Sequence, residues 1–232
     1  MPTPTAVLLL RAAHPRQAVA TAVALATAAA VAGRPLREVA LAAATVLVGQ
    51  GIIGWADDLA DRRRDERRRP DKPLVGARLD PGTVWFALTC AVLLVVPLSV
   101  SHGRRAGAAY LAVLIISAVG DRFLHARVVS FLPWVASFAL YPAFLAYGGW
   151  NGVGATTAPT VAMTALVGAL GLGVHLLLAL PGLVDDHEEG EQSLPMVLAL
   201  RTGTPRLLLL ASVFTGVVAV AILIAGRTVG LT

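Results

Sequence analysis

Long apolar runs separated by short polar segments repeat along the whole chain. Each run has about the 20 residues that a helix needs to cross the hydrocarbon core of a membrane, residues 106–120 being on the short side. The seven runs are residues 17–32, 39–56, 83–101, 106–120, 128–148, 160–181 and 206–226. This pattern predicts an all-α, polytopic transmembrane helix bundle of about seven helices, formed by residues 1–232 as a single domain.

Composition strengthens this prediction. Hydrophobic residues make up 56% of the chain and charged residues 14%, whereas soluble domains carry about 25% charged residues. The basic residues lie at the ends of the apolar runs, so the sequence pI near 10.3 reflects membrane topology and does not indicate nucleic-acid binding. Cys90 is the only cysteine, which excludes an internal disulfide and a cysteine-based metal site.

The first apolar run has two interpretations. Residues 17–32 are rich in alanine and end in Ala-Val-Ala before Gly33, which resembles a signal-peptide cleavage site. We prefer a retained first helix. Cleavage would leave the orientation of the following helices unchanged.

Charge placement predicts the orientation of the helices. With a cytoplasmic N-terminus, 14 of the 19 Lys and Arg residues lie in cytoplasmic segments, as the positive-inside rule expects. The same side holds 13 of the 14 acidic residues, Glu38 being the exception, and the rule does not require that. We therefore expect a multi-pass protein of the cell membrane, with two acidic segments at one cytoplasmic mouth of the bundle.

The first acidic segment follows the second apolar run. Its four aspartates share one arc of about 100° on a helix, and they are Asp57, Asp58, Asp61 and Asp65. Like charges on one face repel, so a cation is expected against them. Mg²⁺ that also carries phosphate oxygens fits this set, because Mg²⁺ prefers oxygen ligands. A solvated, salt-bridged helix end is the alternative.

The second acidic segment repeats this spacing. Asp185, Asp186 and Glu189 have the same i, i+1, i+4 pattern as Asp57, Asp58 and Asp61. Two facing carboxylate clusters can hold a diphosphate through bridging Mg²⁺ ions. Two unrelated solvated loops would also explain the repeated spacing.

These motifs resemble those of the UbiA family of membrane prenyltransferases. The family's first motif has Asn-Asp, two further aspartates and an Arg-Pro-Leu…Gly signature, and here Asp57 occupies the asparagine position and Lys72 the arginine position. The other matching residues of this motif are Asp58, Asp61, Asp65, Pro73, Leu74 and Gly76. The second motif is matched by Asp186, Gly190 and the run Ser193-Leu194-Pro195, while Gly182 occupies the place of its first aspartate.

Between the two motifs the resemblance is looser. The run Ser130-Phe131-Leu132-Pro133 matches a family segment, and Asp121 and His125 occupy the places of a Tyr-x-x-x-Lys pair. Family members usually have nine helices, so the resemblance implies that the last hairpin is missing here.

The resemblance implies transfer of a prenyl group from an isoprenoid diphosphate to a small acceptor, aromatic or lipid. Mg²⁺ would neutralise the charge that develops on the departing diphosphate. The catalytic residues implied are Asp58, Asp61, Asp65 and Asp186, with Asp185 and Glu189 as further metal ligands that could replace the aspartate absent at Gly182. Asp57, Arg68, Lys72 and His125 are implied in substrate binding, although Arg68 and Lys72 could serve only the positive-inside rule.

Two polar residues lie deeper in the apolar runs. Gln50 is two helical turns before Asp57 on the same face, and His175 lies on the face of the second cluster. Polar side chains at membrane depth usually face the bundle interior or a cavity. We expect both to line the acceptor pocket, with a helix–helix hydrogen bond as the alternative for each.

Three functions remain open: a prenyltransferase, a membrane terpene cyclase that captures the cation internally, and a non-catalytic protein that binds an isoprenoid lipid or a partner. Gly182 favours the third, and the complete first motif favours the first two. A transporter is less favoured, because the acidic residues cluster at one membrane face and not at the midplane.

Overall fold

The computed structural model describes residues 3–149 and 158–228, apart from the side chains of Arg68, Ala77, Asp121, Arg227 and Thr228. Within these residues the secondary structure is entirely helical, which confirms the all-α prediction. Six helices are long and apolar enough to cross a membrane. Together with the shorter α2 helix, Pro15–Val31, they account for the seven that the apolar runs predict.

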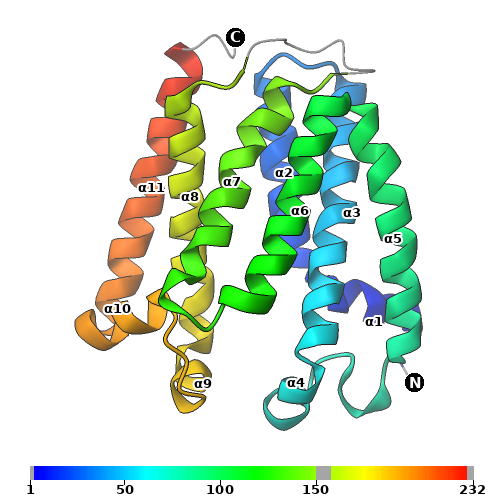
Figure 1. Cartoon of the computed structure of the whole chain (residues 1–232), viewed down its shortest axis with the longest axis vertical. Helices are drawn as coiled ribbons and strands as arrows, with labels where there is room; N and C mark the ends of the chain where they lie inside the picture. Colours follow the sequence, from blue (N-terminus) through cyan, green and yellow to red (C-terminus); the bar gives the residue numbers. More distant parts are fainter. Residues whose placement is uncertain (1–2, 150–157, 229–232) are drawn as a thin grey trace. The chain divides into compact units, whose positions relative to one another are not determined.

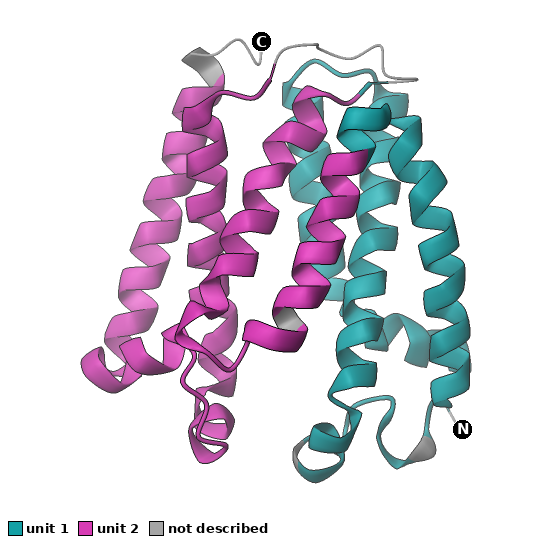
Figure 2. Cartoon of the chain, in the orientation of Figure 1, with its two compact units in different colours: residues 1–107, 149–152 teal, residues 108–148, 153–232 magenta. Residues whose placement is uncertain are grey.

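The chain divides into two compact units, drawn in two colours in Figure 2. Unit 1 contains Met1–Gly107 and Gly149–Gly152, and unit 2 contains Ala108–Gly148 and Val153–Thr232. The first acidic segment belongs to unit 1 and the second to unit 2. Each unit is therefore described by itself.

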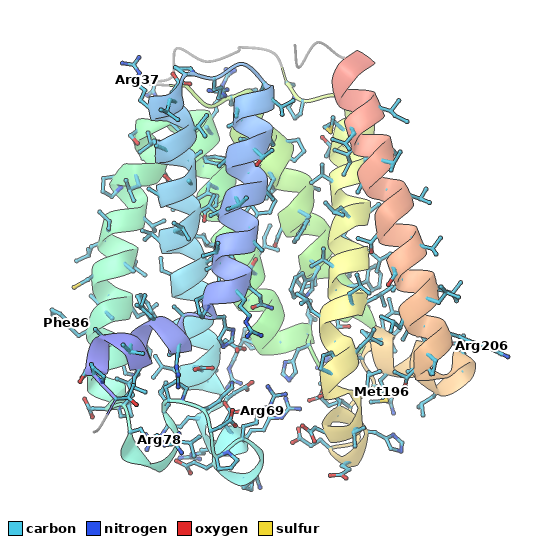
Figure 3. All side chains as sticks on the ribbon, turned by 180° about the vertical axis from the view of Figure 1, so that it is seen from behind. Arg37, Arg69, Arg78, Phe86, Met196 and Arg206 are labelled. Carbon is cyan, nitrogen blue, oxygen red and sulfur yellow. The ribbon has the colours of Figure 1, made fainter. Side chains whose placement is uncertain are left out.

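Unit 1 is built on three long helices. Its elements in chain order are α1 (Thr5–Ala12), α2 (Pro15–Val31), α3 (Leu36–Ala60), α4 (Arg62–Arg68), the 3-10 turn η1 (Val75–Ala77) and α5 (Pro81–Ser101). The short α1 helix lies across the direction of α2, α3 and α5 (Figure 1). Arg37 lies at one end of this unit, and Arg69 and Arg78 lie at the other (Figure 3).

Unit 2 contains most of α6 (Arg104–Leu124), which begins in unit 1. Its further elements are η2 (Val128–Ser130), α7 (Phe131–Ala146), α8 (Val161–Ala179), η4 (Leu180–Gly182), α9 (Leu183–Glu188), α10 (Leu194–Thr202) and α11 (Thr204–Thr228). The α6 helix extends four residues beyond the predicted end of its apolar run at Gly120, so this span is not short.

The long helices leave many apolar side chains exposed, as a lipid environment requires. On α5, Trp85, Phe86 and Leu93 are 58%, 72% and 71% exposed, and Phe86 points away from the bundle in Figure 3. In a soluble protein such surface would be costly. This exposed apolar surface fits the six helices that are long and apolar enough to cross a membrane.

Glycines allow the helices to approach closely. A Cβ atom at Gly171 of α8 would lie 2.5 Å from the Trp134 carbonyl oxygen of α7, and a Cβ atom at Gly107 of α6 would lie 2.7 Å from the Ser99 carbonyl oxygen of α5. Small residues at interfaces are typical of membrane helices, which associate mainly through close packing.

A buried polar contact joins α3 to the turn after α5. The Thr45 hydroxyl donates to the Leu41 carbonyl oxygen at 2.8 Å and lies 3.0 Å from Nε2 of His102. Because the hydroxyl has a single proton, Nε2 of His102 is the donor in the second bond. Burial lowers the pKa of the His102 imidazole, the nearby Arg34 lowers it further, and Glu38 offsets part of this change.

Candidate active site

The first acidic segment begins in the last turn of α3, where Asp57 and Asp58 follow a close approach of the backbone. A Cβ atom at Gly54 would lie 2.8 Å from the carbonyl carbon of Ala13. A larger residue would therefore push the N-terminal segment away from α3. Gly54 is one helical turn before Asp58, so the contact brings His14, the residue after Ala13, to the two aspartates.

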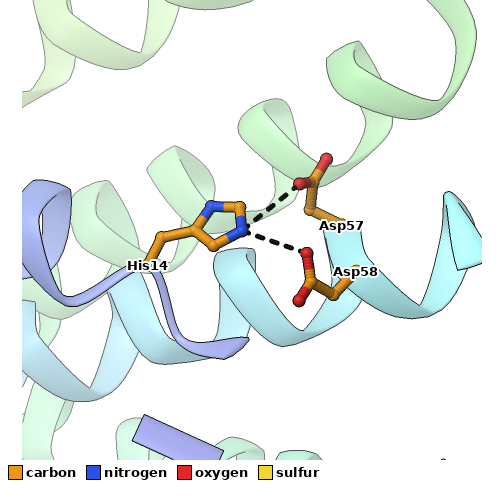
Figure 4. Close-up of side chains that lie close together, drawn as sticks. All are labelled: His14, Asp57 and Asp58. Atoms are coloured by element: carbon orange, nitrogen blue, oxygen red, sulfur yellow. Dashed lines mark hydrogen bonds and ion pairs between the residues drawn. The ribbon is translucent and has the colours of Figure 1, made fainter. Parts of the chain in front are cut away.

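His14 contacts both carboxylates (Figure 4). Its Nε2 atom lies 3.1 Å from Oδ1 of Asp58 and 3.8 Å from Oδ2 of Asp57. The side chain of Asp58 is only 1% exposed. The hydrogen bond to Asp58 raises the pKa of the His14 imidazole above its usual value, although burial opposes the rise.

Lys72 joins two aspartates that the sequence separates. Its Nζ atom lies 2.8 Å from Oδ1 of Asp58 and 2.7 Å from Oδ2 of Asp65. Burial alone would lower the pKa of this ammonium group, but the bonds to the two carboxylates outweigh burial and raise it. Lys72 is therefore the counter-ion of two buried carboxylates, in the position that the family signature gives to arginine.

The signature residues after Lys72 hold the loop in place. Leu74 is 2% exposed and packs in a small apolar core with Leu8 and Ala12 of α1. Gly76 has φ of 66°, a left-handed conformation that glycine adopts without strain. The Pro-Leu…Gly signature thus positions the lysine by packing and by a tight turn.

The predicted arc of four aspartates requires one continuous helix through the first motif, and the structure has two. The α3 helix ends at Ala60, Asp61 is its C-terminal cap, and α4 begins at Arg62. Asp65 nevertheless comes close to Asp58, because both bind Lys72. Asp61 is half-buried. The Arg68 side chain lies outside the described residues, so its predicted place within the arc has no structural test.

A hollow opens at the junction of α3 and α4. It has a volume of about 390 Å³ and is lined by Leu59, Ala60, Arg62, Arg63 and Glu66. None of the motif aspartates lines it. The candidate active site is therefore defined by the carboxylates and their cationic partners, and not by this hollow.

In unit 2, the second acidic segment follows α8 through a tight turn. Asp185 and Asp186 lie in the first turn of α9, and Glu189 caps the end of that helix. A Cβ atom at Gly182 would lie 3.8 Å from both carboxylate oxygens of Asp186. The position where the family has its first aspartate thus faces Asp186, and a side chain there meets only ordinary contacts.

Two segments that match the family, residues 130–133 and residues 193–195, contact each other in unit 2. Oγ of Ser130 accepts a hydrogen bond from the Leu194 backbone N–H at 3.2 Å and lies 3.0 Å from Nε2 of His175. The His175 ring is buried and stacks on Trp134 with ring centroids 5.5 Å apart. The predicted pocket residue His175 therefore makes the interhelical hydrogen bond that the sequence left as its alternative role.

His125 and Gln50 also have defined places. Nε2 of His125 lies 3.8 Å from Oε1 of Glu191, so His125 is close to the loop of the second motif. Gln50 is half-buried on α3, two turns before Asp57. Asp121, which the resemblance pairs with His125, has a side chain outside the described residues. Residues 150–157 also lie outside them.

Sequence reasoning missed His14 and the α1 helix. The acidic motif is 43 residues further along the chain, and no spacing rule connects the two segments. The one available signal was a histidine directly before Pro15, because proline favours the first position of a helix and so predicts that His14 caps the start of α2.

Within the described residues these features define an all-helical, multi-pass membrane protein with an acidic motif at the end of a long helix in each unit. The model of the UbiA prenyltransferase family matches residues 18–231, nearly the whole chain. The chain belongs to this family of membrane prenyltransferases. No curated protein and no solved structure matches the sequence.

Proposed function

We propose that this protein transfers a prenyl group from an isoprenoid diphosphate to a small acceptor, aromatic or lipid. One observation carries the proposal: two motif carboxylates, Asp58 and Asp65, are buried around a single lysine at the end of a membrane-spanning helix. Burying like charges together is costly, and a divalent cation that binds together with the anionic diphosphate would offset that cost.

The residues present fit Mg²⁺. Carboxylates of Asp58, Asp61 and Asp65 supply the oxygen ligands that this ion prefers, and Asp57 lies beside them. In unit 2, Asp186 is the corresponding ligand. When bound, the ion would neutralise negative charge on the departing diphosphate.

The chain's own residues would perform the remaining tasks. Lys72 carries a full positive charge and can donate to phosphate oxygens next to the carboxylates. Arg68, the last residue of α4, is our second candidate for binding phosphate. Apolar helices would bury the isoprenoid tail and exclude water from the allylic cation. Gln50, His175 and His125 are our candidates for contacts to the acceptor or the diphosphate.

The site would open to the cytoplasm at the inner face of the cell membrane. This orientation rests on the charge count, in which 14 of the 19 basic residues and 13 of the 14 acidic residues share one side. Both acidic segments would then meet a diphosphate from the same aqueous compartment.

The test is incubation of purified protein with Mg²⁺ and prenyl diphosphates of increasing chain length. Diphosphate release would be measured with and without a pool of aromatic acceptors. Release that depends on an acceptor supports a transferase, and release without one supports a terpene cyclase. We expect Asp61→Ala to abolish Mg²⁺-dependent binding of the diphosphate; unchanged binding would show that the metal assignment is wrong.

A non-catalytic isoprenoid-binding or accessory role is the second candidate, and the glycine at position 182 favours it. If the site is active, another carboxylate must replace the absent aspartate. Asp185 is adjacent to Asp186 and needs little rearrangement, and Glu189 has the longer reach. We expect Asp185 to compensate.

Gly182→Asp separates these two candidates, because a Cβ atom at this position meets both Asp186 oxygens only at an ordinary 3.8 Å. A compensated site should change little, or lose activity because like charges crowd together. A degenerate site should gain Mg²⁺-dependent diphosphate binding. Such a gain, together with no effect of Asp185→Asn in the parent, would favour the accessory role.

A further inference from the structure

The N-terminal strap, defined as residues 5–14, is fastened to the first acidic motif by several independent contacts. Nε1 of Trp55 on α3 donates to the Leu9 carbonyl oxygen at 2.9 Å. Leu8 and Ala12 pack in the apolar core with Leu74 of the signature loop. The strap precedes residues 18–231, which match the family.

The strap ends in a strained residue. His14 has φ of 49° and is the one residue other than glycine with positive φ in the described part of the chain. This conformation costs about 1–2 kcal/mol for a residue with a Cβ atom. The close approach of Ala13 to Gly54 holds the backbone in this state, and the imidazole consequently points at Asp57 and Asp58.

Three ligand atoms converge there. Nε2 of His14 and one carboxylate oxygen each from Asp57 and Asp58 all lie within 4.8 Å of one another. Neighbouring ligands of one ion, each about 2.1 Å from it, are about 3 Å apart, and His14 and Asp58 are separated by 3.1 Å. The side chains of His14 and Asp57 are 31% and 27% exposed, so an ion can reach them from solvent.

Lys72 does not have to hold Asp58, because it has a second partner. Its Nζ atom lies 2.7 Å from Oδ2 of Asp65, so Lys72 can keep Asp65 while Asp58 turns to the ion.

We propose that His14 is a nitrogen ligand of the metal centre at the first acidic motif and that, with Asp57 and Asp58, it raises the affinity of this centre for first-row transition ions relative to Mg²⁺. Imidazole suits ions such as Fe²⁺ and Zn²⁺, whereas Mg²⁺ takes oxygen ligands. Mn²⁺ binds most weakly in the transition series, but it is paramagnetic and can report a nitrogen ligand directly. The inference rests on the proposed function in one respect, that a divalent ion binds at the first motif.

The experiment uses the full-length protein in detergent with Mn²⁺ as the probe and needs no substrate. Electron paramagnetic resonance would measure Mn²⁺ binding, and pulsed measurements would detect coupling of the bound ion to an imidazole nitrogen. Competition with Mg²⁺ would give the ratio of the two affinities. His14→Asn is the main variant, because asparagine tolerates the left-handed backbone better than most residues do. His14→Gly is a second variant with the same tolerance, and Arg16→Gln is the matched control.

We expect nitrogen coupling in the parent protein and in Arg16→Gln, and its loss in His14→Asn or His14→Gly with Mn²⁺ still bound. The preference for Mn²⁺ over Mg²⁺ should fall at least tenfold in these variants. Binding of Mn²⁺ to the parent without nitrogen coupling, or coupling that survives in both variants, would overturn the role of His14 and leave the proposed function intact. Failure of the parent to bind Mn²⁺ or Mg²⁺ at all, even with a prenyl diphosphate, would overturn both.

Discussion

At the scale of single residues, Lys72 is the shared counter-ion of Asp58 and Asp65. Neither role that the sequence suggests for Lys72, phosphate binding or membrane topology, includes these two ion pairs. Its contacts with Asp58 and Asp65 depend on the turn after α4, where the Lys72 carbonyl accepts from Val75 and the Pro73 carbonyl accepts from Leu79. No periodicity describes such a turn, so its consequence could not be predicted.

Lys72→Met should destabilise the protein, because it leaves Asp58 and Asp65 buried without their shared cation. Removing one partner of a buried ion pair costs about 3 kcal/mol. Thermal unfolding in detergent would measure the loss. If the carboxylates bind Mg²⁺, added Mg²⁺ should raise the thermal unfolding midpoint of the Lys72→Met variant more than that of the parent protein.

Lys72→Arg is the control for this experiment, since it keeps the charge and restores the residue of the family signature. We expect near-parental stability and the same response to Mg²⁺. A Lys72→Met variant as stable as the parent would mean that Asp58 and Asp65 take up protons or partners that the structure does not show.

At the scale of elements, the apolar runs predict the long helices well and the short ones poorly. The run predicted at residues 83–101 corresponds to α5, Pro81–Ser101, and that at residues 160–181 to α8 with η4. The short α1 and α10 helices were not predicted, because eight or nine residues carry too little periodicity. The break at Asp61 is also not predicted, because no proline or glycine marks it in the sequence.

The packing of α7 on α8 should depend on Gly171. In Gly171→Ala the new methyl group would meet the Trp134 carbonyl oxygen at 2.5 Å and the Phe138 side chain at 2.8 Å. Overpacking of this kind destabilises by about 2 kcal/mol. Gly216→Ala on α11 is the matched control, because nothing lies within 4 Å of its new Cβ atom. Equal unfolding midpoints for the two variants would contradict the close α7–α8 contact.

The buried contact between Thr45 of α3 and His102 after α5 should make the free energy of unfolding depend on pH. Burial and Arg34 lower the pKa of His102 in the folded protein, with Glu38 opposing them, so the unfolded chain binds the proton more tightly. Stability from His102 is therefore complete above its ordinary pKa of about 6.5 and is lost as the pH falls below that value.

Unfolding midpoints between pH 5 and pH 7.5 test this dependence. The parent should lose more stability on acidification than His102→Gln, whose amide can still donate to Thr45 and does not titrate. Effects of the other histidines cancel in the difference between the two proteins. Parallel pH profiles would show that protonation of His102 costs the folded state nothing.

At the scale of the whole molecule, the sequence accounts for the class of protein and for the order of its motifs. The length and the apolar composition of the runs predict the membrane helices. The match of the UbiA family model to residues 18–231 confirms the resemblance that the motifs indicated. The contact of His14 with the first motif could not be foreseen, because it depends on the close approach of Ala13 to Gly54. Each compact unit contains one acidic motif, so one site built from both requires that the motifs share a membrane side.

That shared side can be tested by chemical labelling. Cys90 is the single native cysteine, so Cys90→Ser provides a cysteine-free background for single cysteines placed at Asp71, Glu188, Arg34 and Arg105. In intact cells a membrane-impermeant maleimide should label the cysteines at positions 34 and 105, because the charge count places these segments outside. In inside-out vesicles it should label those at 71 and 188, which belong to the loops of the two acidic motifs. Labelling of positions 71 and 188 from opposite sides would rule out one diphosphate site formed by both motifs, and it would leave the His14 centre of the first motif to be judged by its own metal-binding experiment.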